Sequence, residues 1–244
     1  LHVRSRRQRQ MCIRDRYKNA WLIIAKANLH VGNENVSNYG LIDKAIQRDI
    51  VTNLPCINSS SLKGAINEYT TMVCTTSITP QQRISIFGVD KNDKSKTQKG
   101  NTVFFDANIL ALPRPNDHTL YELATCDAVL DRFVERLSIF QLPINKATLI
   151  NKIQTICGRT PIIYSSEQFK DFCEDDELPI IARNCLENGE SKNLWYEQVL
   201  PRETVLGTLL LSSEDTLAKV LNGKVIQIGA NATIGYGYCE FIQL

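Results

Sequence analysis

The sequence lacks the cysteine and histidine patterns that hold metal ions, and no apolar run is long enough to cross a membrane. Its three histidines are widely spaced, and its eight cysteines show no C-x-x-C spacing, which argues against zinc fingers and multi-histidine metal centres. The best apolar run, Ala20–Ala27, contains Lys26 and is shorter than the roughly 18–20 residues of a span. We therefore expect reduced, mostly buried thiols, a cytoplasmic location and no membrane partner.

Nucleotide-binding signatures are also missing. There is no G-x-x-x-x-G-K motif, no dinucleotide fingerprint between two strands and no internal repeat, so ATP binding is disfavoured. The composition, 43% hydrophobic and 22% charged over 244 residues, is that of a globular protein with a sizeable core. It excludes collagen, coiled coils and wholesale disorder.

Basic charge is concentrated at the start of the chain. Residues 1–16 hold six arginines and one aspartate, and the remainder carries 22 Lys+Arg against 25 Asp+Glu. Nucleic-acid binding must therefore come from local clusters. The run MCIRDRY within 1–16 resembles translated adapter sequence, so we expect a non-native or disordered leader there and a single domain over 17–244. The alternative is a basic arm that grips nucleic acid.

Hydrophobic periodicity predicts strands and helices that interleave along the chain. We expect an α+β fold with a sheet on one side and helices on the other. The helices are predicted after the serines of 59–61, one of which would cap the helix, over Tyr121–Phe140, and over Ser212–Asn222 with Ser212 as its cap. The predicted strands are Trp21–Leu29, Arg83–Phe87, Asn101–Leu112, Pro161–Tyr164, parts of Leu194–Leu211, and two that flank a glycine loop after Lys224.

Four residues are candidates for acid–base chemistry. Asp43 and Asp49 follow the polar loop Gly32–Gly40, and either carboxylate could hold Mg²⁺ weakly or accept a proton. Local reasoning does not choose between them, and a solvated loop acid is the simple alternative. His30 is either the base of a metal-free ribonuclease or a structural histidine. Glu197 is either a second acid or a partner of Arg202.

Two segments have the chemistry of RNA-backbone contacts. In NSSSLKG at 58–64, helix N–H groups, hydroxyls and Lys63 could converge on a phosphate, and Gly64 suggests a close backbone approach. In GANATIGYGY at 229–238, backbone amides could follow phosphates while tyrosines stack on bases. The alternatives are simple helix capping and a glycine-rich hairpin turn.

Taken together and in order, five segments resemble one family. They are HVGNENVSNYGLIDKAIQRD with LPCINSSSLKGAINEY, then IFG…FFDANILALP, TCDAVLDRF, LWYEQVLPRET and IQIGANATIGYGY. This series is similar to the RAMP-superfamily backbone subunits of type III CRISPR effectors, and to those of the type III-B (Cmr) complex in particular. The resemblance implies a ferredoxin-like (RRM-type) palm with inserted loops and a β-hairpin thumb, which we place in Ser85–Phe105 or Gly158–Leu178.

The resemblance also implies function. Such subunits stack as copies along a CRISPR guide RNA with other Cmr subunits, and cut single-stranded target RNA at regular intervals by 2′-hydroxyl transesterification. Asp43, in the context Ile-Asp-x-x-Ile-Gln-Arg, becomes the catalytic residue and the ligand of loosely bound Mg²⁺ or Mn²⁺, with Glu197 as an accessory. His30 stays an accessory candidate on local grounds alone. The implied RNA-binding residues are Arg48, Ser60, Ser61, Lys63, Gly229, Asn231, Gly235, Tyr236 and Gly237.

Two other functions fit the same superfamily. One is a guide-coating scaffold without catalytic activity, against which the Asp43-bearing loop argues. The other is a metal-independent endoribonuclease that processes guides, commonly through a histidine, for which His30 would be the candidate.

Overall fold

The computed structural model describes residues 16–32, 42–89 and 98–244, and its core is a mixed α+β sheet structure. Four strands form the centre of the sheet in the order β11-β1-β9-β4, and all neighbours are antiparallel. With two helices they give a β-α-β-β-α-β sequence, the ferredoxin-like arrangement. The α+β class is therefore confirmed. In chain order the core elements are β1 (Tyr17–Ala25), α2 (Ser59–Met72), β4 (Ala107–Arg114), β9 (Val205–Ser212), α7 (Thr216–Leu221) and β11 (Tyr238–Gln243).

Further elements extend this core at both edges. Strand β10 (Lys224–Gln227) pairs with β11, and at the other edge β5 (Glu122–Cys126) and β6 (Ile162–Tyr164) follow β4. Short strands β2 (Cys56–Ile57) and β3 (Val103–Phe104) pair with β4 and β9. The remaining helices are α3 (Pro80–Phe87), α4 (Asp127–Ile139), α5 (Lys146–Cys157), α6 (Ser166–Asp171) and the 3₁₀ helix η2 (Ala232–Ile234).

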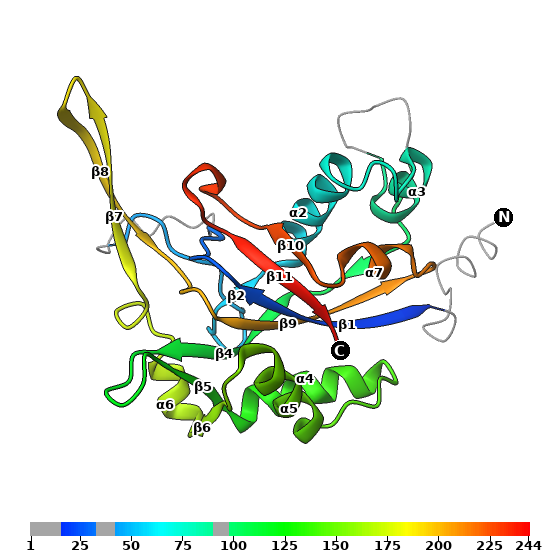
Figure 1. Ribbon diagram of the computed structural model, residues 1–244, viewed down its shortest axis with the longest axis horizontal. Coiled ribbons are helices and arrows are strands. Elements are labelled where there is room, and N and C mark those ends of the chain that lie inside the picture. The colour runs from blue at the N-terminus through cyan, green and yellow to red at the C-terminus, as the bar shows by residue number, and fades with distance from the viewer. Residues whose placement is uncertain (1–15, 33–41, 90–97) are drawn as a thin grey trace.

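Helices cover both faces of the sheet rather than one. In Figure 1, α2 and α3 lie on one side of it, and α4, α5 and α6 on the other. Every residue of β9 is buried, as expected for a strand with both faces covered. The close approach of α4 requires Gly207, because a Cβ there would lie 2.8 Å from the Phe133 ring. The predicted one-sided layering is therefore wrong, because the insertion between β4 and β9 covers the face opposite α2.

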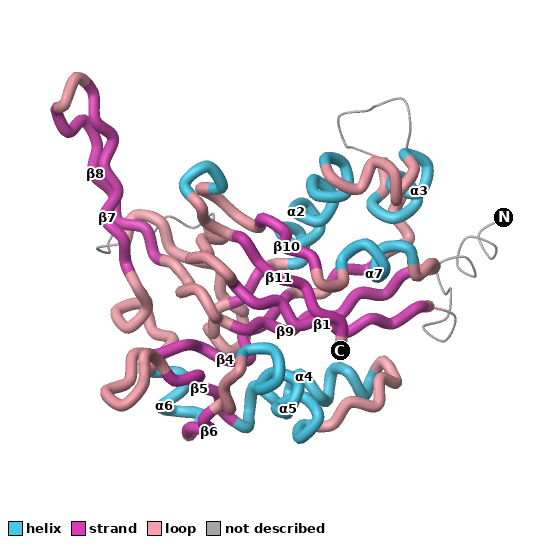
Figure 2. The backbone as a smooth tube through the Cα atoms, in the orientation of Figure 1, coloured by secondary structure: helices cyan, strands magenta, loops and turns pink. Residues whose placement is uncertain are grey.

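A two-stranded hairpin projects from the body (Figures 1 and 2). Its strands are β7 (Ile180–Glu187) and β8 (Glu190–Gln198), and they form a sheet of their own. Asn188 and Gly189 join them, both with positive φ, as the tightest hairpin turn requires. Both ranges in which we placed the thumb are wrong, because this projecting hairpin lies outside them. The Asn-Gly pair was the signal in the sequence.

Two predicted elements have the wrong type. Arg83–Phe87 is the end of helix α3, not a strand: Thr79 and Gln82 form a capping box and Pro80 occupies the first turn, all helix-start signals. Within Tyr121–Phe140, the first part is strand β5 and only the remainder is helix α4. The apolar spacing of that segment fits either period, and pairing with β4 and β6 decides for a strand.

Both predicted serine caps are also wrong. Helix α2 begins after Asn58, and the Ser59 N–H donates to the Asp106 carboxylate at 2.6 Å. Helix α7 begins after Asp215, while Ser212 ends strand β9 and bonds to the Glu214 carbonyl. The expected strand Asn101–Leu112 is divided into β3 and β4, and the other expected elements are confirmed with their ends shifted by a few residues.

Some expectations fall outside the described residues. They include the leader, except Arg16, and most of the polar loop Gly32–Gly40. Among the described helices, none combines the length and apolarity that a membrane crossing needs.

The seven cysteines of the described ranges are free thiols. Burial raises the pKa of Cys56, Cys173 and Cys239 to about 12 and that of Cys157 to about 11, so these thiols stay protonated. Only Cys185, on the hairpin, is exposed among them.

We predict that iodoacetamide at pH 8 modifies Cys185 in the folded protein and spares Cys56, Cys173 and Cys239. Peptide mass spectrometry measures this, and a urea-unfolded sample, in which all four react, is the control. Modification of Cys239 as fast as Cys185 would contradict the burial described.

Candidate functional site

Asp43 lies at the surface and is held against the root of the hairpin. Its backbone N–H donates to the Tyr196 carbonyl at 3.0 Å, and its Oδ2 accepts the Tyr196 N–H at 2.7 Å. The next residue continues this pairing, since Lys44 N–H donates to the same carbonyl and the Lys44 carbonyl accepts from Gln198. An exposed carboxylate is therefore fixed to the edge of β8 through Oδ2, and within the described residues its Oδ1 has no hydrogen-bond partner.

Glu197 follows Tyr196 on β8 and is buried beside this edge. Its side chain is 2% exposed, and its Oε2 accepts from Arg183 Nε at 3.2 Å and from Asn231 Nδ2 at 2.7 Å. Its Oε1 lies 3.6 Å from His30 Nε2. A buried carboxylate needs such partners to offset the loss of hydration. Glu197 therefore joins the hairpin, the glycine loop and the end of the segment after β1.

His30 is enclosed by the protein in this arrangement. Its side chain is 3% exposed and its Nδ1 lies 2.7 Å from the Gln198 carbonyl. Because a carbonyl only accepts, Nδ1 carries the hydrogen and Nε2 faces Glu197. These contacts support a positioning role, since no reacting hydroxyl reaches either nitrogen without displacing protein atoms.

Gln198 is a positioning residue that our sequence reasoning missed. Its fully buried side chain accepts from the Ile46 N–H at 3.2 Å and donates to Asp175 Oδ1 at 3.0 Å. Its own backbone carbonyl holds His30. A glutamine after the Trp-Tyr-Glu run carries no special sequence signal, so only the fold shows that it links three segments.

The glycine loop packs against this cluster. A Cβ at Gly229, which has φ +82°, would lie 2.2 Å from the His30 carbonyl oxygen, so only glycine fits. Asn231 adopts a left-handed conformation and donates to Glu197, and the Tyr236 ring lies 4.8 Å from the Arg183 guanidinium. Gly235 is open to its surroundings. The loop thus supports the hairpin root, besides any contact it makes with RNA.

The predicted anion site at the start of α2 is partly occupied by the protein itself. Asp106 accepts the Ser59 N–H, and Ser61 Oγ accepts from Gln47 Nε2 at 3.0 Å. Ser60 is exposed and Lys63 is half-exposed. The close backbone approach expected at Gly64 is not found, because no described atom lies within 4 Å of the Cβ position.

Arg48 is bonded within the protein. Its Nη1 donates to the Asn53 carbonyl at 2.8 Å and its Nη2 to Asp175 Oδ1 at 2.6 Å, and the side chain is 12% exposed. An RNA phosphate would have to displace Asp175 to reach it. Desolvation opposes ionisation of Asp175, but hydrogen bonds from Gln198 and Arg48 and the charge of Arg48 outweigh it and hold the pKa of the carboxyl below its ordinary value.

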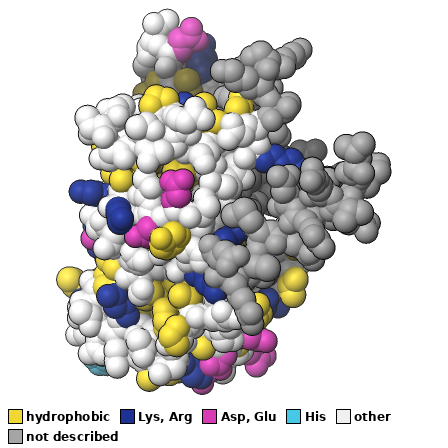
Figure 3. Space-filling model, turned by 90° about the vertical axis from the view of Figure 1, so that its right-hand side faces the viewer, with side chains coloured by type: hydrophobic (Ala, Val, Ile, Leu, Met, Phe, Trp, Pro, Cys, Tyr) yellow, Lys and Arg dark blue, Asp and Glu magenta, His cyan; other side chains and the backbone are white. Residues whose placement is uncertain are grey.

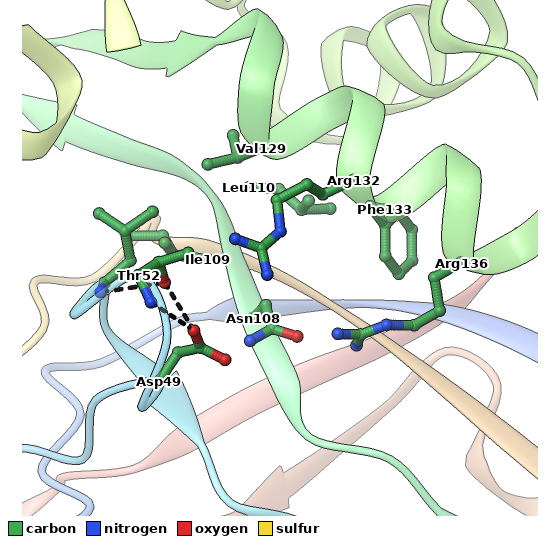
Figure 4. A pocket seen from close by; sticks show the side chains of 10 residues that line it. Asp49, Thr52, Asn108, Ile109, Leu110, Val129, Arg132, Phe133 and Arg136 are labelled. Carbon is green, nitrogen blue, oxygen red and sulfur yellow. Dashed lines mark hydrogen bonds between the residues drawn. The ribbon is translucent and has the colours of Figure 1, made fainter. Parts of the chain in front are cut away.

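Asp49 anchors a turn rather than facing the site. Figure 4 shows it at a pocket between the loop, β4 and helix α4, opposite Arg132 and Arg136. Its Oδ1 accepts from the Val51 N–H, the Thr52 N–H and the Thr52 hydroxyl. Burial opposes its ionisation, but these bonds and the charge of Arg132 hold the pKa of Asp49 below its ordinary value. The structure thus distinguishes Asp43, at the hairpin root, from Asp49, which closes a turn. Local sequence reasoning could not choose between them.

In the part of the face in Figure 3 that the structure describes, Lys and Arg side chains are scattered among acidic and apolar ones. At the hairpin root, Lys44 and Arg183 lie beside the carboxylates of Asp43 and Glu197, with Lys44 Nζ 4.9 Å from the Trp195 ring centre. The root of the hairpin is therefore the candidate site.

We predict that Asp49→Ala lowers the free energy of unfolding by about 1 kcal/mol, since the turn loses three hydrogen bonds to one carboxylate oxygen. The lowered pKa makes this contribution complete above about pH 4, and it is lost as the pH falls through the folded-state pKa. Urea unfolding at pH 7 and pH 3 measures it. An equal difference between Asp49→Ala and wild type at both pH values would contradict the stabilising role of the charge.

Comparison with known proteins identifies the family of this chain. The RAMP superfamily model matches residues 23–240. The chain is 27% identical over 263 residues to the CRISPR system Cmr endoribonuclease Cmr4 of Pyrococcus furiosus (strain ATCC 43587 / DSM 3638 / JCM 8422 / Vc1), with 82% of this chain and 88% of that protein covered.

Solved structures share the fold. A chain of the type III-B Cmr-beta complex bound to cognate target RNA matches with a TM-score of 0.73 at 21% identity, covering 93% of this chain and 97% of that one. Oligomeric Cmr4 from Pyrococcus furiosus matches with a TM-score of 0.69 at 18% identity, covering 93% and 99%. With the family model spanning the palm, the hairpin root and the glycine loop, the chain belongs to the RAMP superfamily.

Proposed function

We propose that this protein is a backbone subunit of a type III-B CRISPR effector that coats guide RNA and cleaves complementary target RNA. The observation that carries the proposal is the exposed Asp43 carboxylate, fixed by Tyr196 at the root of a projecting hairpin. The Pyrococcus furiosus relative is named as an endoribonuclease of the Cmr system, which supports the same activity.

The reaction is cleavage by the RNA's own 2′-hydroxyl. The O2′–P bond forms while the P–O5′ bond breaks, leaving a 2′,3′-cyclic phosphate and a 5′-hydroxyl. The hydroxyl proton passes to Asp43 directly or through a water, and the leaving 5′ oxygen takes up a proton. A carboxylate held at one oxygen, with the other unbonded within the described residues, suits this role. Most of the acceleration then comes from holding the ribose and phosphate in line.

A divalent cation fits as a loosely held, substrate-assisted ligand. No group of three or more potential protein ligands occurs in the described ranges, and within those ranges Asp43 Oδ1 has no hydrogen-bond partner. Mg²⁺ commonly binds through one or two carboxylates with substrate phosphate and water as its other ligands. Mg²⁺ or Mn²⁺ bound there would supply Lewis-acid stabilisation of the phosphate charge. Asp43 would hold it through the same oxygen, so this carboxylate either accepts the proton or holds the cation.

The fold directs RNA to the loops and the hairpin. An RRM binds RNA on the open face of its sheet, but here α4, α5 and α6 cover that face. Guide RNA would follow Ser60, Lys63 and the loop Gly229–Gly237, where surface residues remain, and target RNA would lie opposite. Base pairing would then supply sequence specificity. We expect further copies of the chain and other Cmr subunits along the guide, in the cytoplasm.

The two alternative functions make different demands on the site. A metal-independent nuclease acting through a histidine needs an accessible ring, whereas the His30 side chain is 3% exposed. A non-catalytic scaffold would use Asp43 only to hold the hairpin root through the Tyr196 N–H, and its exposed carboxylate would have no further role. A cleaving subunit accounts for both the buried His30 ring and the fixed Asp43 carboxylate.

We predict that Asp43→Asn abolishes target cleavage in the reconstituted complex, lowering the rate by at least about 100-fold, with target affinity within about twofold of wild type. Asn cannot accept a proton and binds cations weakly. Asp49→Asn is the matched control, because it removes an equal charge from the same segment outside the site, and it should cleave at the wild-type rate. Single-turnover cleavage with guide, target and Mg²⁺ measures both.

Chelation by EDTA should stop wild-type cleavage, and Mn²⁺ should restore it. Undiminished cutting by Asp43→Asn would overturn the catalytic assignment. EDTA-resistant cutting that His30→Ala removes would instead identify the metal-independent alternative. Binding of guide and target without cleavage under any of these conditions would identify the scaffold.

A further inference from the structure

Two buried N–H donors at the hairpin root have no hydrogen-bond partner within the described ranges. They are Nη2 of Arg183 and Nε1 of Trp195. The great majority of buried donors in folded proteins are paired, because an unpaired one forfeits its bond to water without replacing it. Three other buried side-chain atoms of the described ranges are also unpaired, Trp21 Nε1, Arg48 Nε and Asn108 Oδ1. The hairpin root differs because its two donors belong to residues paired across the hairpin, where one ligand could supply both acceptors.

The two residues that carry these donors are neighbours. Arg183 on β7 is directly opposite Trp195 on β8 in the hairpin register, so both side chains project from the same face of the hairpin. Trp195 precedes Tyr196, whose N–H is bound by the Asp43 carboxylate. Lys44 Nζ lies 4.9 Å from the Trp195 ring centre. The unpaired donors therefore lie next to the candidate catalytic carboxylate, in a setting that carries two cations.

Two contacts hold the Arg183 side chain in place and leave its Nη2 unused. Its Nε donates to Glu197 Oε2 at 3.2 Å, and its guanidinium carbon lies 4.8 Å from the Tyr236 ring centre. The side chain is 20% exposed. A guanidinium that is fixed by a carboxylate and a ring, with one terminal nitrogen unused, is preorganised for a further anion.

We infer that Arg183 and Trp195 form a subsite for a phosphate of the RNA backbone beside Asp43. Both donors are covered in this structure, so the RNA backbone must displace the side chains over them. A phosphate then presents two non-bridging oxygens, one for each donor, and charge-assisted bonds from arginine are the strong ones. Base edges also offer acceptors, but a subunit that cuts any guide-paired sequence has no use for base readout. This inference rests on the proposed function, and it adds the group that fixes the target backbone where Asp43 acts.

The test is a double-modification cycle in target binding. Complexes carry Asp43→Asn so that the target stays intact, and the targets carry one neutral methylphosphonate at each of the phosphates around the cleaved bond in turn. Trp195→Phe removes only the indole N–H and keeps an aromatic ring beside Lys44. Arg183→Met is combined with Glu197→Gln, so that no buried carboxylate is left without its cation.

At one phosphate, methylphosphonate substitution should weaken binding to the parent complex by about tenfold, and each variant should weaken binding of the unmodified target by about 5- to 10-fold. When a variant complex binds the methylphosphonate target, its affinity should fall by no more than the larger of the two separate losses. The arginine double variant should also reduce the slope of log affinity against log salt by about one. Trp195→Phe should leave the melting temperature of the free protein unchanged or higher, because the lost donor has no partner there.

Penalties that multiply at every phosphate would overturn the subsite. So would a lower melting temperature for free Trp195→Phe, which would show that the indole has a partner within the protein. Loss of affinity on abasic substitution, with none on methylphosphonate substitution, would assign the donors to a base. If the wild-type complex neither binds nor cleaves a guide-matched target, the proposed function fails instead, and the two failures are thereby distinguished.

Discussion

One buried charge organises the candidate site. The Glu197 carboxylate is 2% exposed and can be stable there only with the partners that surround it, Arg183, Asn231 and His30. Removing one member of such a buried set typically costs about 3–5 kcal/mol. These partners come from the hairpin, from the glycine loop near the C-terminus and from the segment after β1. The same strand residue is flanked by Tyr196, which fixes Asp43, and by Gln198, which fixes His30. Satisfying one carboxylate thus brings together segments that are distant in the sequence and leaves Asp43 at their surface.

The insertion between β4 and β9 changes how a ferredoxin-like palm can meet RNA. Its helices α4, α5 and α6 cover the sheet face that would otherwise be open, and its hairpin projects from the opposite end of the same insertion. The fold therefore provides a rigid support, and chemistry depends on loops and on the hairpin root. Asp49 illustrates the distinction: it is six residues from Asp43, yet it closes a turn beside α4 and takes no part in the site. Proximity in sequence is a poor guide here because the chain turns between the two residues.

Sequence reasoning was reliable where a single periodicity applied and a boundary was marked. Helix α2, strand β1 and the strands around the glycine loop follow from apolar spacing alone. It was wrong where the apolar spacing fitted both a helix and a strand, as in Tyr121–Phe140. There, pairing with β4 and β6 makes the first part of the segment the strand β5. It also overlooked local signals that were present: Thr79-Pro80 at the start of α3 and Asn188-Gly189 in the hairpin turn. For the site, the family resemblance selected Asp43, but the roles of Gln198 and Arg183 depend on tertiary contacts that no spacing encodes.

The central claim is that the Glu197 cluster holds Asp43 at the reacting ribose of the target. Its most direct test is a structure of the assembled complex with guide RNA and a target whose attacking 2′-hydroxyl is replaced by fluorine. We expect an Asp43 carboxylate oxygen within about 3 Å of the 2′ substituent, or joined to it through one water or cation, with the Glu197 contacts unchanged. A scissile phosphate placed away from the hairpin root, beyond reach of Asp43 even through a water, would contradict the claim.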